Sequence, residues 1–338
     1  MGRKINDSYV LAKTDLSNLT GGETLKVEWD TVNNGNLHWK DVDESSLEYV
    51  APAVWYGERG MFFGGESGGN VMDYITIATT GNATDFGNLI NTIYGQNSCS
   101  GGSRIIIAGG NSLSSMDYIT VSTPSNAQSF GSLTNVGGRR CSAVADGTYA
   151  VFGGVLSNNS RTTKLDYVTI STTGNSVSFG DCVGSGGYRG SLSNGTRDIF
   201  VGGYLASASP SVNIEYITIA STGNGTDFGD LGAARGHGGA CEDATRGIYG
   251  GGNEGAGYVN RIEYITMATN GNATDFGDLG SNLESLGACA NTTRGVFGGG
   301  GSAQVNTMQY ITIQTTSNTT DFGDLTVARM GLSGCSGD

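Results

Sequence analysis

The strongest constraint on this chain is an internal repeat that occurs six times between residues 54 and 338. Each copy contains a tyrosine, and successive tyrosines are spaced by 44, 49, 49, 48 and 46 residues. A phenylalanine follows each tyrosine after 12 residues, although the surrounding loops vary in length. A period of this length indicates an array of similar supersecondary units. The structural residues of the repeat are Tyr74, Tyr118, Tyr167, Tyr216, Tyr264 and Tyr310, with Phe86, Phe130, Phe179, Phe228, Phe276 and Phe322.

Each unit offers four short strand candidates within about 47 residues, which is the size of one propeller blade. In the stretch 214–220, Ile214 and Tyr216 lie on one face of a strand, and Glu215 and Ile217 lie on the other. Both faces are largely apolar, as expected for a sheet that packs between two neighbours. The sequence therefore predicts an all-β fold, a six-bladed β-propeller with four strands per blade.

The two ends of the repeat array complement each other. The last copy ends after Cys335 and lacks the aromatic strand that leads to Gly-Gly in the other copies. The first copy begins with that strand, at residues 58–65, and lacks the stretch that should precede it. Pairing the two fragments completes one blade and removes two exposed sheet edges. We therefore predict that the propeller, residues 54–338, closes by pairing its N- and C-terminal strands.

Residues 1–53 lie outside the repeat. They contain an alternating stretch at 24–29 and two of the three tryptophans, Trp29 and Trp39. We interpret this segment as an N-terminal arm or small strand segment that docks on the propeller or on a partner. The alternative is a mobile leader, which its aromatic content disfavours.

The charge of the chain excludes some partners. Its 18 Lys and Arg against 31 Asp and Glu give a formal net charge of −13, which disfavours nucleic acid and anionic membrane surfaces. The longest apolar runs, such as 104–108, are too short to span a bilayer, so we expect no membrane insertion. The N-terminal residues are polar and do not resemble a signal peptide, so we expect synthesis in a cytoplasm.

The six cysteines are expected to be reduced, because a chain of this size needs no disulfide framework. Five recur near one place in the repeat and are interpreted as small buried apolar residues, whereas Cys182 lies in a different part of its copy. The five are Cys99, Cys141, Cys241, Cys289 and Cys335.

No motif in the chain indicates an enzyme. The two histidines, His38 and His237, are not at metal-ligand spacing from a cysteine or from each other, so we expect neither a metal site nor a cofactor. Residues 65–69 match Gly-x-Ser-x-Gly around Ser67, but a hydrolase needs a helix after this serine, and here a loop leads to another strand. We therefore expect no catalytic residue and a non-enzymatic role.

Charged and amide residues also recur in the repeat. We expect the arginines to bridge to the aspartates within or between blades, and the alternative is a ring of carboxylates that binds a divalent cation. Asn-x-Thr sequences at the hairpin tips are interpreted as tight turns and not as glycosylation sites. The arginines are Arg59, Arg104, Arg197, Arg246 and Arg294, and the aspartates are Asp85, Asp227, Asp275 and Asp321, with a second series at Asp181, Asp230, Asp278 and Asp324.

The Gly-Gly pair followed by a tyrosine and a second aromatic residue resembles the kelch propeller repeat, with Phe where kelch usually has Trp. The finer pattern joins Glu-Tyr-Ile-Thr-Ile-Ala to Asp-Phe-Gly-Asp-Leu and to Thr-Arg-Gly-Ile-Phe-Gly-Gly-Gly. It is similar to the kelch-like repetitive proteins of tailed bacteriophages over residues 54–338. The resemblance implies a virion structural protein of the tail, its fibres or the capsid surface, present in multiple copies. Its partners would be other virion proteins, contacted through the arm or the propeller loops.

An alternative function is a carbohydrate-binding propeller that recognises glycans on a host surface. Exposed aromatic residues in the variable loops could stack on sugar rings. The candidate glycan contacts are Tyr188, Tyr204 and Tyr258.

Overall fold

The computed structural model describes residues 57–337 except 112, 136–138, 156–159 and 185, together with four short strands nearer the N-terminus. The chain divides into two compact units, Met1–Ala53 and Val54–Asp338. In the first unit, β1 (Arg3–Ile5) pairs with β2 (Ser8–Val10), and β3 (Trp29–Thr31) pairs with β4 (Leu37–Trp39), both antiparallel. The rest of the predicted arm lies outside the described residues, so its docking stays a prediction.

The second unit consists of six four-stranded antiparallel sheets, the predicted blades. Blade 1 contains β28 and β5 to β7, and blades 2 to 6 follow in chain order. The innermost strands are β8 (Gln96–Ser100), β12 (Ser142–Ala145), β16 (Gly190–Ser193), β20 (Gly239–Glu242), β24 (Gly287–Ala290) and β28 (Ser333–Gly337). The second strands are β5 (Arg59–Phe63), β9 (Arg104–Gly109), β13 (Tyr149–Val155), β17 (Arg197–Val201), β21 (Arg246–Gly250) and β25 (Arg294–Gly298). The third strands are β6 (Val71–Thr76), β10 (Ser115–Thr120), β14 (Arg161–Thr169), β18 (Asn213–Thr218), β22 (Arg261–Thr266) and β26 (Thr307–Thr312). The outermost strands are β7 (Thr84–Asn88), β11 (Gln128–Ser132), β15 (Val177–Asp181), β19 (Thr226–Asp230), β23 (Thr274–Asp278) and β27 (Thr320–Asp324).

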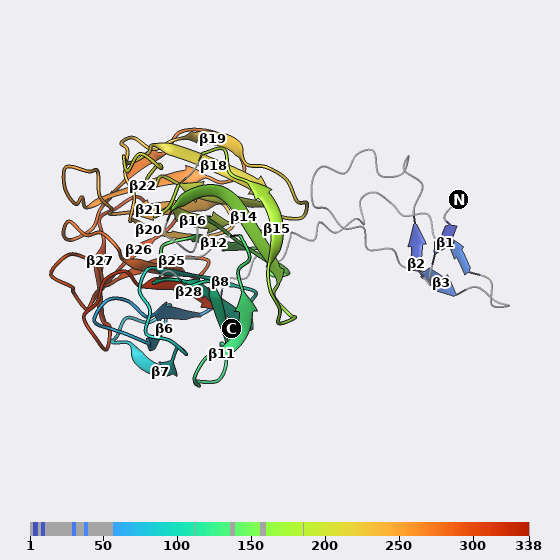
Figure 1. Cartoon of the computed structure of the whole chain (residues 1–338), viewed down its shortest axis with the longest axis horizontal. Coiled ribbons are helices and arrows are strands. Elements are labelled where there is room, and N and C mark those ends of the chain that lie inside the picture. The colour runs from blue at the N-terminus through green and yellow to red at the C-terminus, as the bar shows by residue number, and fades with distance from the viewer. Residues whose placement is uncertain are drawn as a thin grey trace. The chain divides into compact units, whose positions relative to one another are not determined.

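The sheets form a closed ring around their innermost strands. Each innermost strand contacts the innermost strands of both neighbouring blades, and these strands lie near the centre of the ring in Figure 1. The C-terminal strand β28 pairs antiparallel with β5, with Cys335 opposite Met61. The prediction of six blades closed by the two ends of the propeller is therefore confirmed. None of the described residues belongs to a helix long and apolar enough to cross a membrane.

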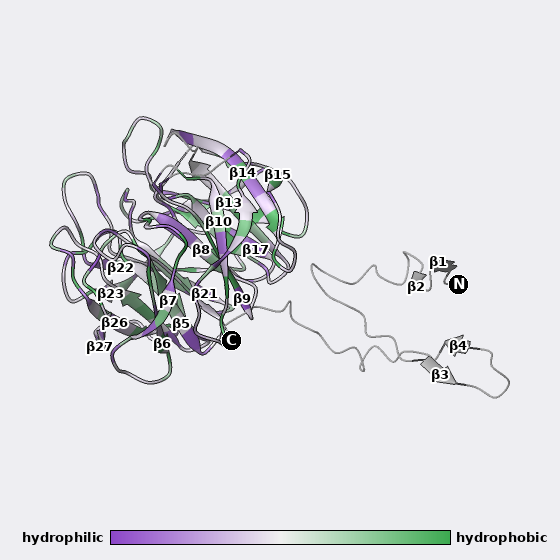
Figure 2. Cartoon of the chain, turned by 60° about the horizontal axis from the view of Figure 1, so that its bottom comes forward, coloured by the Kyte–Doolittle hydropathy of each residue, from purple (hydrophilic) through white to green (hydrophobic). Residues whose placement is uncertain are grey.

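The hydrophobic core is divided into six clusters, each between two neighbouring blades. Between blades 4 and 5, Ile214 and Phe228 of blade 4 pack with Met267 of blade 5. Ile217, on the opposite face of β18, belongs to the cluster shared with blade 3. Hydrophobic residues accordingly lie along the packed strands, for example near β22 and β26 in Figure 2. Each blade thus buries both faces, as its alternation predicted.

The tyrosine and phenylalanine of each repeat form a T-shaped pair within their blade. The ring centroids are 5.9–6.2 Å apart in all six pairs. A β-bulge accompanies each pair: in blade 1, Met72 lies opposite Gly87 and Asp73 lies opposite Asp85, so that Phe86 is the extra residue. An edge-to-face contact stabilises such a pair by about 1 kcal/mol beyond its burial. The constant spacing of 12 residues reflects this shared geometry.

The expected bridges between repeat arginines and aspartates are wrong. Each of the five arginines instead stacks on the tyrosine of its own blade, with Cζ 4.2–4.8 Å from the ring centroid. Arg104 also donates to the carbonyl of Ile170 in the next blade at 2.9 Å, and Arg294 donates to that of Ile77 at 3.1 Å. Aspartates such as Asp275 are exposed on the outermost strand. The tyrosine lies closer to the arginine because the second and third strands are direct neighbours in the sheet.

The hairpin tip between the third and fourth strands binds the outermost strand of the preceding blade. In all six blades the tip asparagine accepts a hydrogen bond from a backbone N–H of that strand at 3.0–3.1 Å. The predicted tight turn at these asparagines is wrong. In blade 1 the turn lies earlier, closed by the bond from Thr79 N–H to the Thr76 carbonyl, and the segment around Asn82 instead bonds to the preceding blade. The asparagines are Asn82, Asn126, Asn175, Asn224, Asn272 and Asn318.

All six cysteines are free thiols; five are buried and Cys335 is partly buried. Burial raises the pKa of every one of them, which disfavours the reactive thiolate. Cys182 lies at the position that Leu231 and Leu279 occupy in their copies, which explains its different place in the sequence. Cys141 precedes β12 and does not share the strand position of the other four, where blade 3 has Val144.

Replacing Gly323 with alanine should weaken the interface at which the ring closes. Gly323 has a φ of +138°, and a Cβ there would lie 2.4 Å from the carbonyl oxygen of Gly81 in blade 1. We expect the free energy of unfolding to fall by roughly 2 kcal/mol or more, with a lower melting temperature. The matched control is Gly81→Ala, whose Cβ would meet no atom within 4 Å. Equal melting temperatures for the two variants in circular dichroism would contradict this account of the interface.

Candidate functional site

The six innermost strands enclose a central channel. Two cavities in it, of about 100 and 90 Å³, are lined by residues from all six of these strands or the loops that enter them. Most of the lining residues are serine, alanine or glycine, and Glu242 is the acidic residue among them. Burial raises the pKa of Glu242 to about 8. Larger side chains, those of Arg140, Tyr188 and His237, line the cavity of about 100 Å³, and we call this end of the channel the mouth.

A closed circuit of backbone hydrogen bonds surrounds the mouth. One residue of each loop that enters a blade donates its N–H to the carbonyl of the equivalent residue in the preceding blade. Five of the six bonds measure 2.6–3.0 Å, and the sixth joins Arg140 to Gly95. All six residues have φ between +62° and +68°. These residues, the mouth ring, are Gly95, Arg140, Tyr188, His237, Ser285 and Gly331.

Four of the six mouth-ring residues carry side chains in this left-handed conformation. The conformation is costly for most residues other than glycine, and residues held in it cluster at functional sites. The two positions filled by glycine, Gly95 and Gly331, show that the ring itself requires no side chain. The side chains of Arg140, Tyr188, His237 and Ser285 are thus candidates for a role beyond the fold.

Aromatic rings and guanidinium groups pack together at the mouth. The ring of Tyr188 stacks on that of His237, with centroids 4.1 Å apart and planes 19° apart. Tyr204 contacts both rings edge to face, at centroid distances of 6.0 and 5.2 Å. The guanidinium carbons of Arg140 and Arg161 lie 5.2 and 5.4 Å from the Tyr188 centroid. We call these five residues the mouth cluster.

His237 is a neutral hydrogen-bonding group in this cluster. Burial, followed by the nearby charges of Arg140 and Arg161, lowers the pKa of His237 to about 2. Arg140 Nη1 lies 2.5 Å from His237 Nδ1 and donates to Ser285 Oγ at 2.6 Å. Since Nδ1 accepts from the arginine, the proton of the neutral ring is on Nε2. His237 therefore offers an N–H donor at Nε2, and the cluster presents mainly donors.

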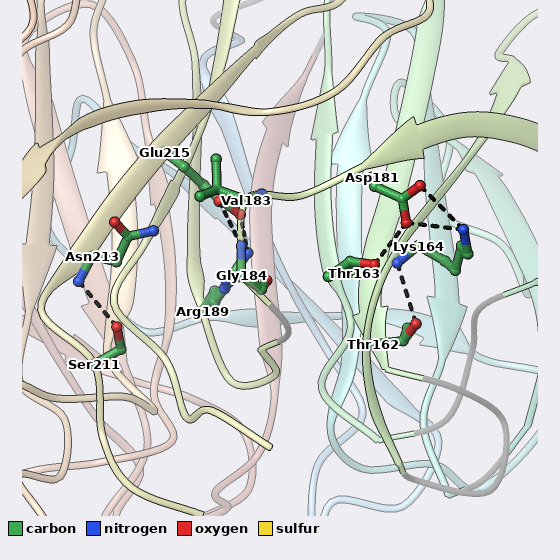
Figure 3. A network of polar contacts seen from close by, with 10 residues as sticks. All are labelled: Thr162, Thr163, Lys164, Asp181, Val183, Gly184, Arg189, Ser211, Asn213 and Glu215. Atoms are coloured by element: carbon green, nitrogen blue, oxygen red, sulfur yellow. Dashed lines mark hydrogen bonds and ion pairs between the residues drawn. The ribbon is translucent and has the colours of Figure 1, made fainter. Parts of the chain in front are cut away.

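A second set of buried polar residues holds the entering loops in place. Glu215, directly before a repeat tyrosine, accepts from the backbone N–H of Val183 at 2.7 Å and of Gly184 at 3.3 Å, and it pairs with Arg189 (Figure 3). The pairs Arg235–Glu263, at 2.9 Å, and Arg329–Asp73, at 3.1 Å, lie in blades 5 and 1. The full set is Asp73, Asp117, Asp166, Glu215, Glu263 and Gln309.

The charge of each buried acceptor is matched to the residue that the loop beside it supplies. In blade 6 the acceptor is the neutral Gln309, and Leu283 stands in the loop where blade 5 has Arg235. In blade 2 the loop has Ile93 at this place, and burial of Asp117 raises its pKa. Blades 1, 4 and 5 thus pair a buried carboxylate with an arginine, which offsets part of the cost of burying either charge.

The structure brings together two of the three candidate glycan contacts. Tyr188 and Tyr204 belong to the mouth cluster, whereas Tyr258 lies on the β21–β22 loop, bridged to Asn253, with no ring contact to either tyrosine. His237 already covers one face of Tyr188. Glycan binding stays a prediction. Ser67 lies exposed in the turn between β5 and β6, and the described residues contain no group of three or more His, Cys, Asp or Glu side chains that could hold a metal ion.

The sequence reasoning missed most of this site. It treated His237 as an isolated residue among glycines and did not single out Arg140, Arg161 or Ser285. The sequence did contain a signal. The repeat aligns the loops that precede the innermost strands, and in this alignment the mouth-ring position is glycine in two copies and a larger residue in four. It also missed the buried carboxylates, although a polar residue precedes the tyrosine in every copy.

Comparison of the chain with models of known protein families found no match, and comparison with curated proteins found none either. The structure thus shows a six-bladed β-propeller, a fold consistent with an interaction platform, while the similarity to phage proteins rests on the repeat pattern.

Removing the Arg235 charge alone should destabilise blade 5. Arg235→Leu leaves the Glu263 carboxylate buried without its cation, and we expect a loss of roughly 3 kcal/mol in the free energy of unfolding. The double variant Arg235→Leu, Glu263→Gln reproduces the Leu283 and Gln309 pair of blade 6 and should recover most of this loss. Urea denaturation of both variants and of Glu263→Gln measures the coupling. A double variant no more stable than Arg235→Leu would show that the matching of charges is unimportant.

Asp198 should make the propeller less stable as the pH rises. Burial raises the pKa of Asp198 well above its ordinary value, partly offset by Ser193. Because the folded pKa is the higher one, stability is fully present below the unfolded pKa of about 4 and is lost as the pH rises above it. Asp198→Asn cannot ionise, so its melting temperature should exceed that of the wild type at pH 7 and approach it near pH 4. The exposed Asp275→Asn is the control. A constant difference across this range would contradict the assignment.

Proposed function

We propose that this chain is a non-enzymatic structural protein of a tailed-phage virion, in which the propeller is a rigid platform for contacts with other proteins. The observation that carries the platform role is the set of closed contacts between blades. Hairpin asparagines, the buried side-chain acceptors (five carboxylates and Gln309) and the mouth ring make these contacts around the whole ring. Blades held in this way keep the loops at fixed positions, as a platform for partners requires.

The virion assignment is supported by the repeat pattern. The combination of Glu-Tyr-Ile-Thr-Ile-Ala, Asp-Phe-Gly-Asp-Leu and Arg-Gly-aromatic-Gly-Gly is similar to that of kelch-like repetitive phage proteins. We propose a place on the tail, a fibre or the capsid surface, in multiple copies, after synthesis in the host cytoplasm. The partners would be other virion proteins, with contacts made by residues 1–53 or by the propeller loops. The net charge of −13 supports protein partners over nucleic acid.

Deleting residues 1–45 should separate assembly from stability. These residues lie in a different compact unit from the propeller, so the melting temperature should change little. The truncated chain should be incorporated into phage particles less than the full chain. The measurement is immunogold labelling of purified particles of the encoding phage, with antibody against the propeller. Particles without detectable full-length chain would reject the virion proposal, and equal incorporation of both chains would reject the role of the N-terminal unit.

Recognition of a host glycan is the second candidate function. It is favoured by the convergence of Tyr188 and Tyr204 with His237 at the mouth. Binding of the purified chain to a glycan array would support it.

A further inference from the structure

Arg140 and Arg161 lie over the same tyrosine ring, that of Tyr188, and neither has a carboxylate partner in the described part of the chain. Arg189, Arg235 and Arg329 each form an ion pair with an acidic residue. Among the described residues, no carboxylate lies within ion-pair distance of Arg140 or Arg161. Both are partly buried, and the Nε of each is buried without a hydrogen-bond partner among these residues. The repeat arginines also stack on tyrosines without a carboxylate, but each has a tyrosine of its own, whereas Arg140 and Arg161 bring two guanidinium charges to one ring.

The neighbours of these two arginines hold them in place without neutralising them. Arg140 donates to His237 and Ser285, both uncharged, and lies over Tyr188. Arg161 lies between two tyrosine rings, 5.4 Å from the centroid of Tyr188 and 5.8 Å from that of Tyr204. Stacking of this kind orients a guanidinium and leaves its N–H groups free to bind an anion.

Glu284 is the nearby acid: its charge acts on Arg140 from beyond ion-pair distance, and its hydrogen bond goes to Asn253. Its Oε2 accepts from Asn253 Nδ2 at 3.1 Å and lies 3.8 Å from His237 Nδ1. One carboxylate cannot compensate both guanidinium groups. The mouth therefore keeps a local positive charge.

Arg140 and His237 border a cavity of suitable size, and Arg161 contacts the Tyr188 ring that also lines it. The cavity of about 100 Å³ at the mouth is lined in part by Arg140, Tyr188, His237 and Ser285. This volume holds a group of a few heavy atoms, such as a carboxylate with its hydration. Arg140 presents its remaining N–H groups, and His237 presents Nε2–H, since Nδ1 faces the arginine. Carboxylates are planar acceptors that match the forked donors of arginine.

We propose that the mouth cluster is a binding site for a carboxylate group, in which Arg140 and Arg161 supply the charge and His237 a neutral donor. The group could come from an acidic sugar or from an acidic side chain of a partner protein. Both sources share the chemistry that the cluster recognises. The inference goes beyond the virion assignment and can be tested on the purified chain alone, so the two can fail separately.

The test is isothermal titration of the full chain with two matched pairs of probes. Galacturonate and galactose differ at the carboxylate, and so do N-acetylglutamate amide and N-acetylglutamine amide. We expect binding of at least one acidic probe and at least about tenfold weaker binding of its neutral match. Binding of the sugar acid alone would identify an acidic sugar as the source, and binding of the glutamate derivative alone would identify an acidic side chain. Binding of both acidic probes would show that the site recognises the carboxylate group and not the rest of the ligand. No binding, or equal binding of an acid and its neutral match, would overturn the proposal.

Variants distinguish a binding role from a packing role. Arg161→Gln and Arg140→Gln should each weaken binding of the acidic probe about tenfold or more. Arg161→Lys keeps the charge and should lose less. The control is Arg261→Gln, which removes the same charge from an arginine already paired with Glu254 at 3.2 Å. Melting temperatures establish that each variant is folded. If folded Arg161→Gln and Arg140→Gln bind like the wild type, or if Arg261→Gln loses as much affinity, the two arginines do not form the site.

Discussion

Hydrogen bonds between neighbouring blades are the interactions on which the rest of this structure depends. A four-stranded sheet alone leaves two apolar faces exposed and two edges unpaired. Each blade here covers its neighbour's faces, and its hairpin tip binds the neighbour's outermost strand. Buried carboxylates and the mouth ring repeat this joining nearer the axis. Since each series of contacts returns to its starting blade, no blade is left at an end, and β28 is paired with β5 as each other innermost strand is paired with the second strand of its blade.

Some side chains of the repeat are needed for these contacts and others are not, and the second group can serve a function. The tyrosine, phenylalanine, arginine and asparagine of the repeat are occupied by contacts within or between blades. At the mouth ring the joining is done by the backbone, so the side chains there are under less structural constraint. Glycine is sufficient at Gly95 and Gly331, whereas Arg140, Tyr188 and His237 occupy equivalent positions and form a cluster of donors and aromatic rings. Variation at a position that the fold does not require is typical of a recognition surface.

The fold was more predictable than the contacts that hold it together. The complementary ends at Arg59 and Cys335 indicated closure because a missing strand is visible in a repeat. The partner of Arg104 was predicted wrongly, because its distance along the chain to an aspartate does not show that Tyr118 is the nearer side chain across the sheet. The mouth cluster could not be assembled from the sequence. Arg140 and Ser285 are 145 residues apart, and only ring closure brings their loops to the same opening.

The sequence by itself determined the number of blades, their four strands, the burial of both faces and the pairing of the chain ends, because period and alternation are local properties that repeat six times. The tertiary structure decided which equivalent residues meet at the channel and which charges are compensated. Each blade contributes a single residue to the mouth ring. Which side chains are neighbours at the mouth therefore depends on which blades are neighbours in the ring. That is why Arg140, Tyr188 and His237 act as one site although no segment of the chain contains them together.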